Sequence, residues 1–142
     1  MANNYPGIGV LISMLGGNAD SVAAYKAALK KKITHVELDK AANDGSGELR
    51  FVFEDGVRLA LYDGGQSCCE SRYMTTDDDL SIHIGGKLKA VEIQAAPNVP
   101  SEEDHEVQFL VVKSTKGHST VETHNEHNGY YGGFAIRVRD GW

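Results

Sequence analysis

Cysteine, proline and tryptophan are scarce in this chain, with two, three and one copies among 142 residues. The two cysteines, Cys68 and Cys69, are adjacent, and adjacent cysteines rarely bond because the ring they would close is strained. A disulfide framework is therefore excluded, and a reducing compartment is expected. Long apolar runs are also absent. The longest covers residues 8–15, far short of the roughly 20 residues that span a bilayer, and no basic segment of a secretory signal precedes it.

The chain also has fewer positively charged than negatively charged residues. Fourteen Lys and Arg residues stand against twenty Asp and Glu, which gives a net charge of −6. Such a protein has no overall electrostatic attraction to nucleic acid or to an anionic membrane, and we expect neither as a partner. The hydrophobic content of 41% is that of an ordinary globular protein. We expect an N-terminal segment at residues 1–17 and a single domain at 18–142, since this length can bury a real core.

Familiar catalytic signatures are missing too. No phosphate-binding loop, nucleophile elbow or dinucleotide fingerprint occurs in the sequence. Asp77, Asp78 and Asp79 stand together, whereas calcium loops spread their carboxylates over alternate positions. Three consecutive aspartates before Leu80 favour the start of a helix, where negative charge is stabilised. We therefore expect no cofactor and no bound metal ion.

The hydrophobic pattern predicts an α+β fold that is mostly antiparallel sheet. Val22, Tyr25 and Leu29 fall on one face at helical spacing, which predicts an N-terminal helix over residues 19–31. A second, short helix is expected in mid-chain, beginning near residues 77–79 and ended by the glycines at 85–86. Elsewhere apolar residues recur at every second position, which predicts β-strands. The Asp-Gly pair at 55–56 is typical of a hairpin turn. The predicted strands cover residues 33–39, 49–53, 57–61, 88–95, 107–114, 120–124 and 134–138.

Three lysines, Lys30, Lys31 and Lys32, end the predicted helix. Cations are stabilised at the negative end of a helix dipole, so a solvated helix terminus accounts for them. A phosphate site or a partner site is the alternative.

The most informative stretch is residues 124–134, His-Asn-Glu-His-Asn-Gly-Tyr-Tyr-Gly-Gly-Phe. Its glycines would let the backbone approach a ligand closely. A zinc protease needs histidines four apart on a helix with glutamate directly after the first, and His124 and His127 do not have this spacing. Three interpretations stay open: side chains that brace an unusual loop, a looser metal site that includes Glu70, and a ligand pocket. Tyr130 and Phe134 fit either core packing or stacking on a ligand.

A second polar stretch covers residues 68–80, Cys-Cys-Glu-Ser-Arg-Tyr-Met-Thr-Thr-Asp-Asp-Asp-Leu. Adjacent cysteines on a strand point to opposite faces and cannot easily hold one metal ion. One buried cysteine and one surface cysteine is the simplest interpretation. A structural metal and a reactive thiol are the alternatives.

These two motifs, with the Phe-Glu-Asp-Gly at residues 53–56, resemble a family of short proteins from tailed bacteriophages, notably those that infect actinobacteria. The resemblance spans about residues 32–139. The family is a domain of unknown function, so the resemblance implies no activity, ligand or catalytic residue. It implies a context, namely a phage accessory protein that works in the host cytoplasm.

We therefore expect a small accessory protein that binds a host small molecule or a host protein and is not an enzyme. The alternatives are a metal-dependent hydrolase with His124 and His127 as ligands, and a structural or interaction protein of the virion. Unpaired strand edges also make a homodimer compatible with this fold. The candidate ligand-binding residues are Cys69, Glu70, Arg72, Tyr73, His124, Asn125, Glu126, His127, Asn128 and Tyr130.

Overall fold

The computed structural model of the protein describes residues 19–64, 71–95, 104–127 and 136–140. Within these residues, no helix is both long enough and apolar enough to cross a membrane. In chain order the elements are α2 (Ala19–Ala28), β1 (Ile33–Asp39), η1 (Asn43–Gly45), β2 (Glu48–Phe53), β3 (Arg58–Asp63), β4 (Ser71–Thr75), η2 (Leu80–His83), β5 (Leu88–Ala95), β6 (Asp104–Ser114), β7 (Gly117–His127) and β8 (Ile136–Asp140).

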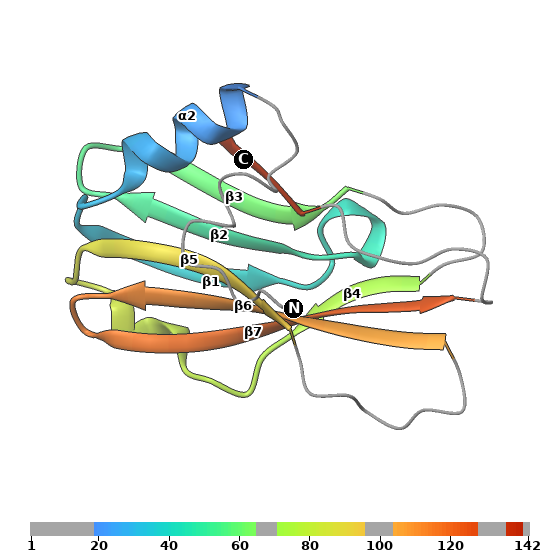
Figure 1. Ribbon diagram of the computed structural model, residues 1–142. Helices are drawn as coiled ribbons and strands as arrows, with labels where there is room; N and C mark the ends of the chain where they lie inside the picture. The colour runs from blue at the N-terminus through green and yellow to red at the C-terminus, as the bar shows by residue number, and fades with distance from the viewer. Residues whose placement is uncertain (1–18, 65–70, 96–103, 128–135, 141–142) are drawn as a thin grey trace.

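The strands form two antiparallel sheets of four strands each. The first sheet has the order β1-β2-β3-β8, and the second has the order β4-β7-β6-β5. In Figure 1 the first sheet lies beneath α2 and the second sheet lies below the first. The long β6–β7 hairpin pairs along its whole length, from Ser114 and Gly117 at the turn to Asp104 and His127 at the open end.

The two sheets share one hydrophobic core. Because side chains alternate along a strand, one face of each sheet can be apolar. In the first sheet, Phe51 and Phe53 of β2 are buried, and their rings stack with 6.1 Å between centroids. Burial of each large apolar side chain contributes about 1.5–3 kcal/mol. All four strands of the second sheet add residues to the same cluster, among them Met74, Ile93, Leu110 and Val121.

Helix α2 covers the core beside β8 and reaches β5 of the other sheet (Figure 1). The hydroxyl of the buried Tyr25 accepts a hydrogen bond from the Val91 N–H at 2.9 Å, and burial raises the pKa of Tyr25. The helix ends at Ala28 because the chain then pairs with the start of β5. Lys30 has a φ of 71°, and its N–H donates to the Leu88 carbonyl at 2.7 Å.

The sheets are joined at one end by residues 30–33 and 85–88. The Ile33 N–H donates to the Gly86 carbonyl at 2.8 Å, and the Gly85 N–H donates to the Ile33 carbonyl at 2.8 Å. Lys32 and Lys87 form an isolated antiparallel bridge beside these bonds. The start of β1 is therefore held to the segment that leads into β5, although the two strands belong to different sheets.

A buried ion pair crosses the core between the sheets. Arg72 of β4 and Asp63 of β3 point inward, with 5% and 2% of their side chains exposed. Arg72 Nη1 donates to both carboxylate oxygens of Asp63 at 2.9 Å. A buried charge that lost its partner would also lack water, so each residue depends strongly on the other. The pair therefore fixes the position of β4 against β3.

The buried His83 fastens η2 to the β6–β7 hairpin. Its Nδ1 lies 2.6 Å from Ser114 Oγ, and its Nε2 lies 3.0 Å from Ser119 Oγ. Ser114 Oγ also accepts the Lys116 N–H, and the neutral ring is satisfied when Ser114 donates to Nδ1 and Nε2–H donates to Ser119. Burial, with a smaller effect from His118, lowers the pKa of His83 and keeps the ring neutral.

The prediction of a mostly antiparallel β fold with few helical residues is confirmed. The predicted helix over 19–31 ends earlier, at Ala28. The predicted mid-chain helix is the short 3₁₀-helix η2, whose preceding Asp79 accepts the Ser81 N–H at 2.9 Å. Strand β4 has no counterpart among the predicted strands, because the charged Arg72 interrupts the apolar alternation although it faces the core.

Two strands also differ in detail from the pattern. β1 contains a register shift between Ile33 and His35, and such a bulge lets both Ile33 and Val36 face the core in spite of their odd spacing. β7 runs from Gly117 to His127, so it extends beyond the predicted end at residue 124 and into the histidine-rich motif. Residues 128–135 lie outside the described part of the chain.

The ion pair between the sheets can be tested with a single and a double variant. Asp63→Leu removes the Asp63 carboxylate from the buried Arg72, and we expect the free energy of unfolding to fall by about 3–5 kcal/mol. The double variant Arg72→Met/Asp63→Leu removes both charges and should recover much of that loss. Urea unfolding followed by circular dichroism measures all three proteins. Equal stability of Asp63→Leu and the wild type would show that the pair does not hold the sheets together.

The buried His83 predicts a loss of stability in mild acid. Its pKa is lowered in the fold, so between the unfolded value near 6.5 and the folded value only the unfolded chain takes up the proton. Stability is complete above this window and falls as the pH falls through it, by up to about 1.4 kcal/mol per pH unit for one histidine. His83→Gln should show a shallower slope in urea unfolding between about pH 7.5 and 5. A slope that does not change with this substitution would contradict the assignment.

Candidate functional site

The two motifs singled out in the sequence lie on neighbouring strands. β4 carries the Ser-Arg-Tyr-Met-Thr part of the first motif, and the end of β7 carries the His-Asn-Glu-His part of the second. The strands pair antiparallel, with Arg72 opposite Asn125 and Tyr73 opposite His124. Segments about 50 residues apart in the chain are thus within side-chain reach of each other.

Strand alternation divides the candidate residues between two faces of the second sheet. Arg72 and Asn125 face the core and are buried, where Arg72 is held by Asp63. Tyr73, His124 and Glu126 lie on the opposite, outer face. The candidate residues in the described part of the chain therefore do not form a single pocket. The inward pair belongs to the core, and the outward three can meet another molecule.

The outer cluster is centred on two stacked rings. Tyr73 and His124 lie face to face, with 4.5 Å between centroids and an angle of 6° between the ring planes. The Tyr73 hydroxyl donates to the carboxylate of the exposed Glu126 in a short hydrogen bond. Burial, followed by this hydrogen bond and the charge of Glu126, raises the pKa of Tyr73 to about 12. The phenol is therefore a donor and not a phenolate at neutral pH.

Three further residues complete the cluster. His105 Nε2 lies 3.0 Å from His124 Nδ1, and His124 Nε2 lies 2.9 Å from Thr75 Oγ1. The Thr75 hydroxyl can donate to Glu122 Oε1 at 3.4 Å, so the arrangement is satisfied when His105 donates to His124 and His124 donates to Thr75. Burial, and then the nearby His105, lower the pKa of His124. His124 is thus a neutral ring on the outer face.

The chemistry of this outer cluster suits recognition. It places the half-buried, stacked rings of Tyr73 and His124 next to the carboxylates of Glu122 and Glu126, and both kinds of group attract a cation. In the described part of the chain, no three His, Cys, Asp or Glu side chains are grouped so as to hold a metal ion. The hydrolase alternative depends on the side chain of His127, of which the structure describes only the backbone, in β7.

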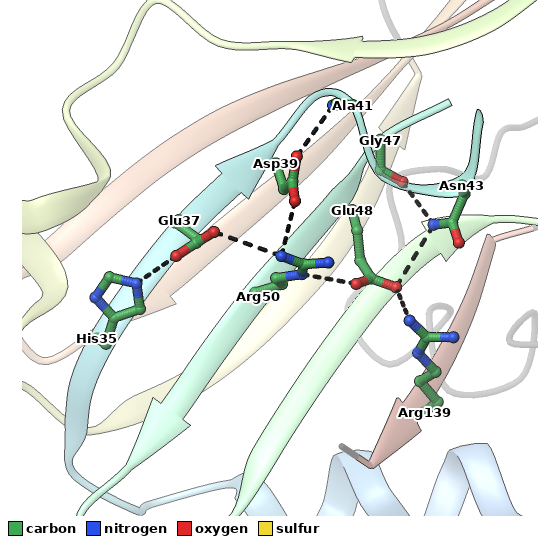
Figure 2. A network of polar contacts seen from close by, with 9 residues as sticks. All are labelled: His35, Glu37, Asp39, Ala41, Asn43, Gly47, Glu48, Arg50 and Arg139. Atoms are coloured by element: carbon green, nitrogen blue, oxygen red, sulfur yellow. Dashed lines mark hydrogen bonds and ion pairs between the residues drawn. The ribbon is translucent and has the colours of Figure 1, made fainter. Parts of the chain in front are cut away.

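A second polar network lies on the outer face of the first sheet, and its carboxylates and guanidinium groups pair with one another (Figure 2). Glu48 is fully buried and accepts hydrogen bonds from Arg50 and Arg139. Arg50 also pairs with Asp39 at 2.8 Å, and Glu37 lies 3.6 Å from the same guanidinium. The Glu48 hydrogen bond is the main reason that the pKa of Arg50 is raised. This network ties β1, β2 and β8 together, so we assign it to the fold.

Three residues of the outer cluster were not among the candidates from the sequence, and four of the candidates lie in parts of the chain that the structure does not describe. His105, Thr75 and Glu122 join it through the strand register, which places His105 opposite Glu126 and Thr75 opposite Glu122. A predicted strand that began at His105 would have found the first of them. The candidates Cys69, Glu70, Asn128 and Tyr130 lie outside the described residues.

The pKa of Tyr73 tests the geometry of the outer cluster. Glu126→Gln removes the negative charge next to the phenol, so the pKa should fall from about 12. It should stay above the ordinary value near 10, because burial is the larger cause and is unchanged. NMR titration of tyrosines labelled at the ring carbon bearing oxygen gives the values, with Tyr73→Phe to identify the signal. Equal pKa values of Tyr73 in the two proteins would show that Tyr73 and Glu126 are not in contact.

Comparison with known proteins assigns the chain to a family. The model of a domain of unknown function, DUF7448, matches residues 26–136. The matched range covers every strand from β1 to β7. Comparisons with curated proteins and with solved structures gave no match. Because the family model covers most of the sequence, the chain belongs to the DUF7448 family, a domain of unknown function.

Proposed function

We propose that the protein is a non-enzymatic binding protein whose outer cluster receives a cationic side chain of a host protein. The observation that carries this proposal is the stacked Tyr73–His124 pair with Glu122 and Glu126 on the same face of the second sheet. Glu126 is exposed, and Tyr73, His124 and Glu122 are half-buried. Groups of both kinds needed to hold a cation are therefore accessible at one place.

Charge supports a cationic group as the ligand. A guanidinium or an ammonium group is attracted to the face of an aromatic ring, and the two carboxylates can accept its hydrogen bonds. The lowered pKa of His124 keeps that ring uncharged, so it does not repel a cation. The net charge of −6 steers cationic partners toward the protein as a whole.

The shape of the surface favours a protein over a small molecule. Small-molecule sites are concave and enclose most of the ligand, whereas the outer cluster lies on the face of a sheet. Protein interfaces combine aromatic and polar groups over such faces. The resemblance to tailed-phage proteins supports a setting inside the host cell, where a phage accessory protein would act on a host protein.

Affinity capture with matched variants tests the proposal. Purified wild type is incubated with lysate of host cells, and retained proteins and small molecules are identified by mass spectrometry. The site variant is Tyr73→Ala/Glu126→Gln. The control is His35→Ala/Glu37→Gln, which removes an exposed ring and carboxylate, 2.6 Å apart, from the first sheet. We expect a protein that wild type and control retain, that the site variant retains at least about tenfold less, and that excess arginine amide displaces.

Each other outcome counts against the proposal. A partner retained equally by the site variant binds elsewhere, and a stoichiometric small molecule would replace the host protein as ligand. Unfolding curves of the three proteins must agree, so that a loss of binding is not a loss of folding.

A further inference from the structure

Lys30 and Lys32, two of the three lysines that follow α2, lie in a second surface that is separate from the outer cluster. We infer that this surface, here called the basic end, docks an acidic segment of a partner protein that also carries apolar side chains. The basic end consists of Ile82, Ile84, Lys30, Lys32, Lys87 and Lys116, all of which are exposed.

Three chain segments bring these residues together. The Thr115 N–H donates to the Lys87 carbonyl at 3.0 Å, and the Leu88 N–H donates to the Lys31 carbonyl at 3.1 Å. The stem of Lys116 covers the glycines that follow Ile84, since a Cβ added at Gly86 would lie 2.6 Å from Lys116 Cγ. The β6–β7 turn, the η2 segment and the end of α2 thus form one continuous surface.

Like charges face each other in this surface. Lys32 and Lys87 are bridge partners on antiparallel segments, which places their Cβ atoms about 4.5–5.5 Å apart. Two lysines directly opposite one another destabilise a sheet. Lys30 adds a third charge at a φ of 71°, a conformation in which glycine is the usual residue after a helix. Lys32 and Lys87 are thus held together in spite of their mutual repulsion, and Lys30 is held in a backbone conformation that favours glycine.

Among the described residues no carboxylate forms an ion pair with the four lysines of the basic end, although Glu54 lies beside Lys32 and its N–H donates to the Lys32 carbonyl at 3.0 Å. Asp55 pairs with Lys31 instead. Asp78 and Asp79 precede η2, but their carboxylates accept the backbone N–H groups of Thr120 and Ser81. An external anion would therefore gain attraction to several lysines at once.

The apolar part of the basic end selects the kind of anion. Ile82 and Ile84 are the exposed large hydrophobic residues of the described chain, each with 41% of its surface accessible. A phosphate or a nucleic acid backbone has no apolar group for them. Two isoleucines alone offer little apolar area to bury in a bilayer. A protein segment with alternating acidic and apolar side chains matches both parts of the surface.

The basic end is separate from the proposed cation site. It adjoins the turn of the β6–β7 hairpin, whereas His105 of the outer cluster lies at the open end. The outer-cluster residue nearest the turn is Glu122, which pairs with Phe109, and the stretch of β6 from Phe109 to Ser114 spans about 17 Å at the usual rise of a strand. This inference therefore does not depend on the proposed function.

Selection from a random peptide library displayed on yeast tests the inference with the whole protein as bait. We expect the enriched peptides to combine Asp or Glu with apolar residues. In fluorescence anisotropy, Lys32→Gln/Lys87→Gln should lower the affinity for such a peptide at least about tenfold. Its unfolding midpoint should be equal to or higher than that of the wild type, since the repulsion is removed. Ile82→Ser/Ile84→Ser should also weaken binding.

A matched control removes the same charge from other exposed sites. Lys26→Gln/Lys40→Gln should bind the peptide as the wild type does. Equal loss in this control would mean attraction by overall charge and would overturn the inference, as would no enrichment or enriched peptides without acidic residues. Sedimentation with phosphatidylglycerol vesicles and with polyphosphate provides a second comparison. Binding of either probe alone, with dependence on Lys32 and Lys87, would assign the surface to a membrane or a polyanion.

Discussion

The ion pair between Arg72 and Asp63 is the contact on which the two-sheet arrangement depends most. It is the described ion pair whose two side chains are both almost fully buried, and it joins β4 to β3 across the core. Hydrophobic burial supplies more free energy in total, but apolar contacts tolerate small shifts of one sheet over the other. A buried charge does not, because its partner must stay within hydrogen-bond distance. The pair therefore sets the position of the short edge strand β4, and with it the outward-facing Tyr73.

Neighbouring residues of the two motifs have opposite roles because of strand geometry. Arg72 and Asn125 stabilise the interior, while Tyr73 and His124, the next residues on paired strands, form a polar cluster on the surface. The packing of the inward residues of each motif therefore also positions the outward residues beside them. A shift of β4 by one residue would move Arg72 out of the core and Tyr73 into it.

The sequence predicted the class of fold well and the site in part. Periodicity located most strands, and the Asp-Gly pair located the turn between β2 and β3, where Gly56 has a φ of 83°. Strand β4 was not predicted because the charged Arg72 interrupts the apolar alternation, and its buried ion pair with Asp63 leaves no mark in the sequence pattern. Residues of both motifs were proposed together as ligand-binding candidates, and the pairing of β4 with β7 brings the described ones onto neighbouring strands. His105 was not among the candidates, since it lies on a third strand, β6, that the register brings alongside.

The length of the β6–β7 hairpin has a consequence for a molecule this small. Eleven residues in each strand give it room for a ring-and-carboxylate cluster toward its open end and for a lysine-rich surface at its turn. The two proposed surfaces carry charges of opposite sign, so they would attract different kinds of partner. Their occupants would not compete for the same side chains.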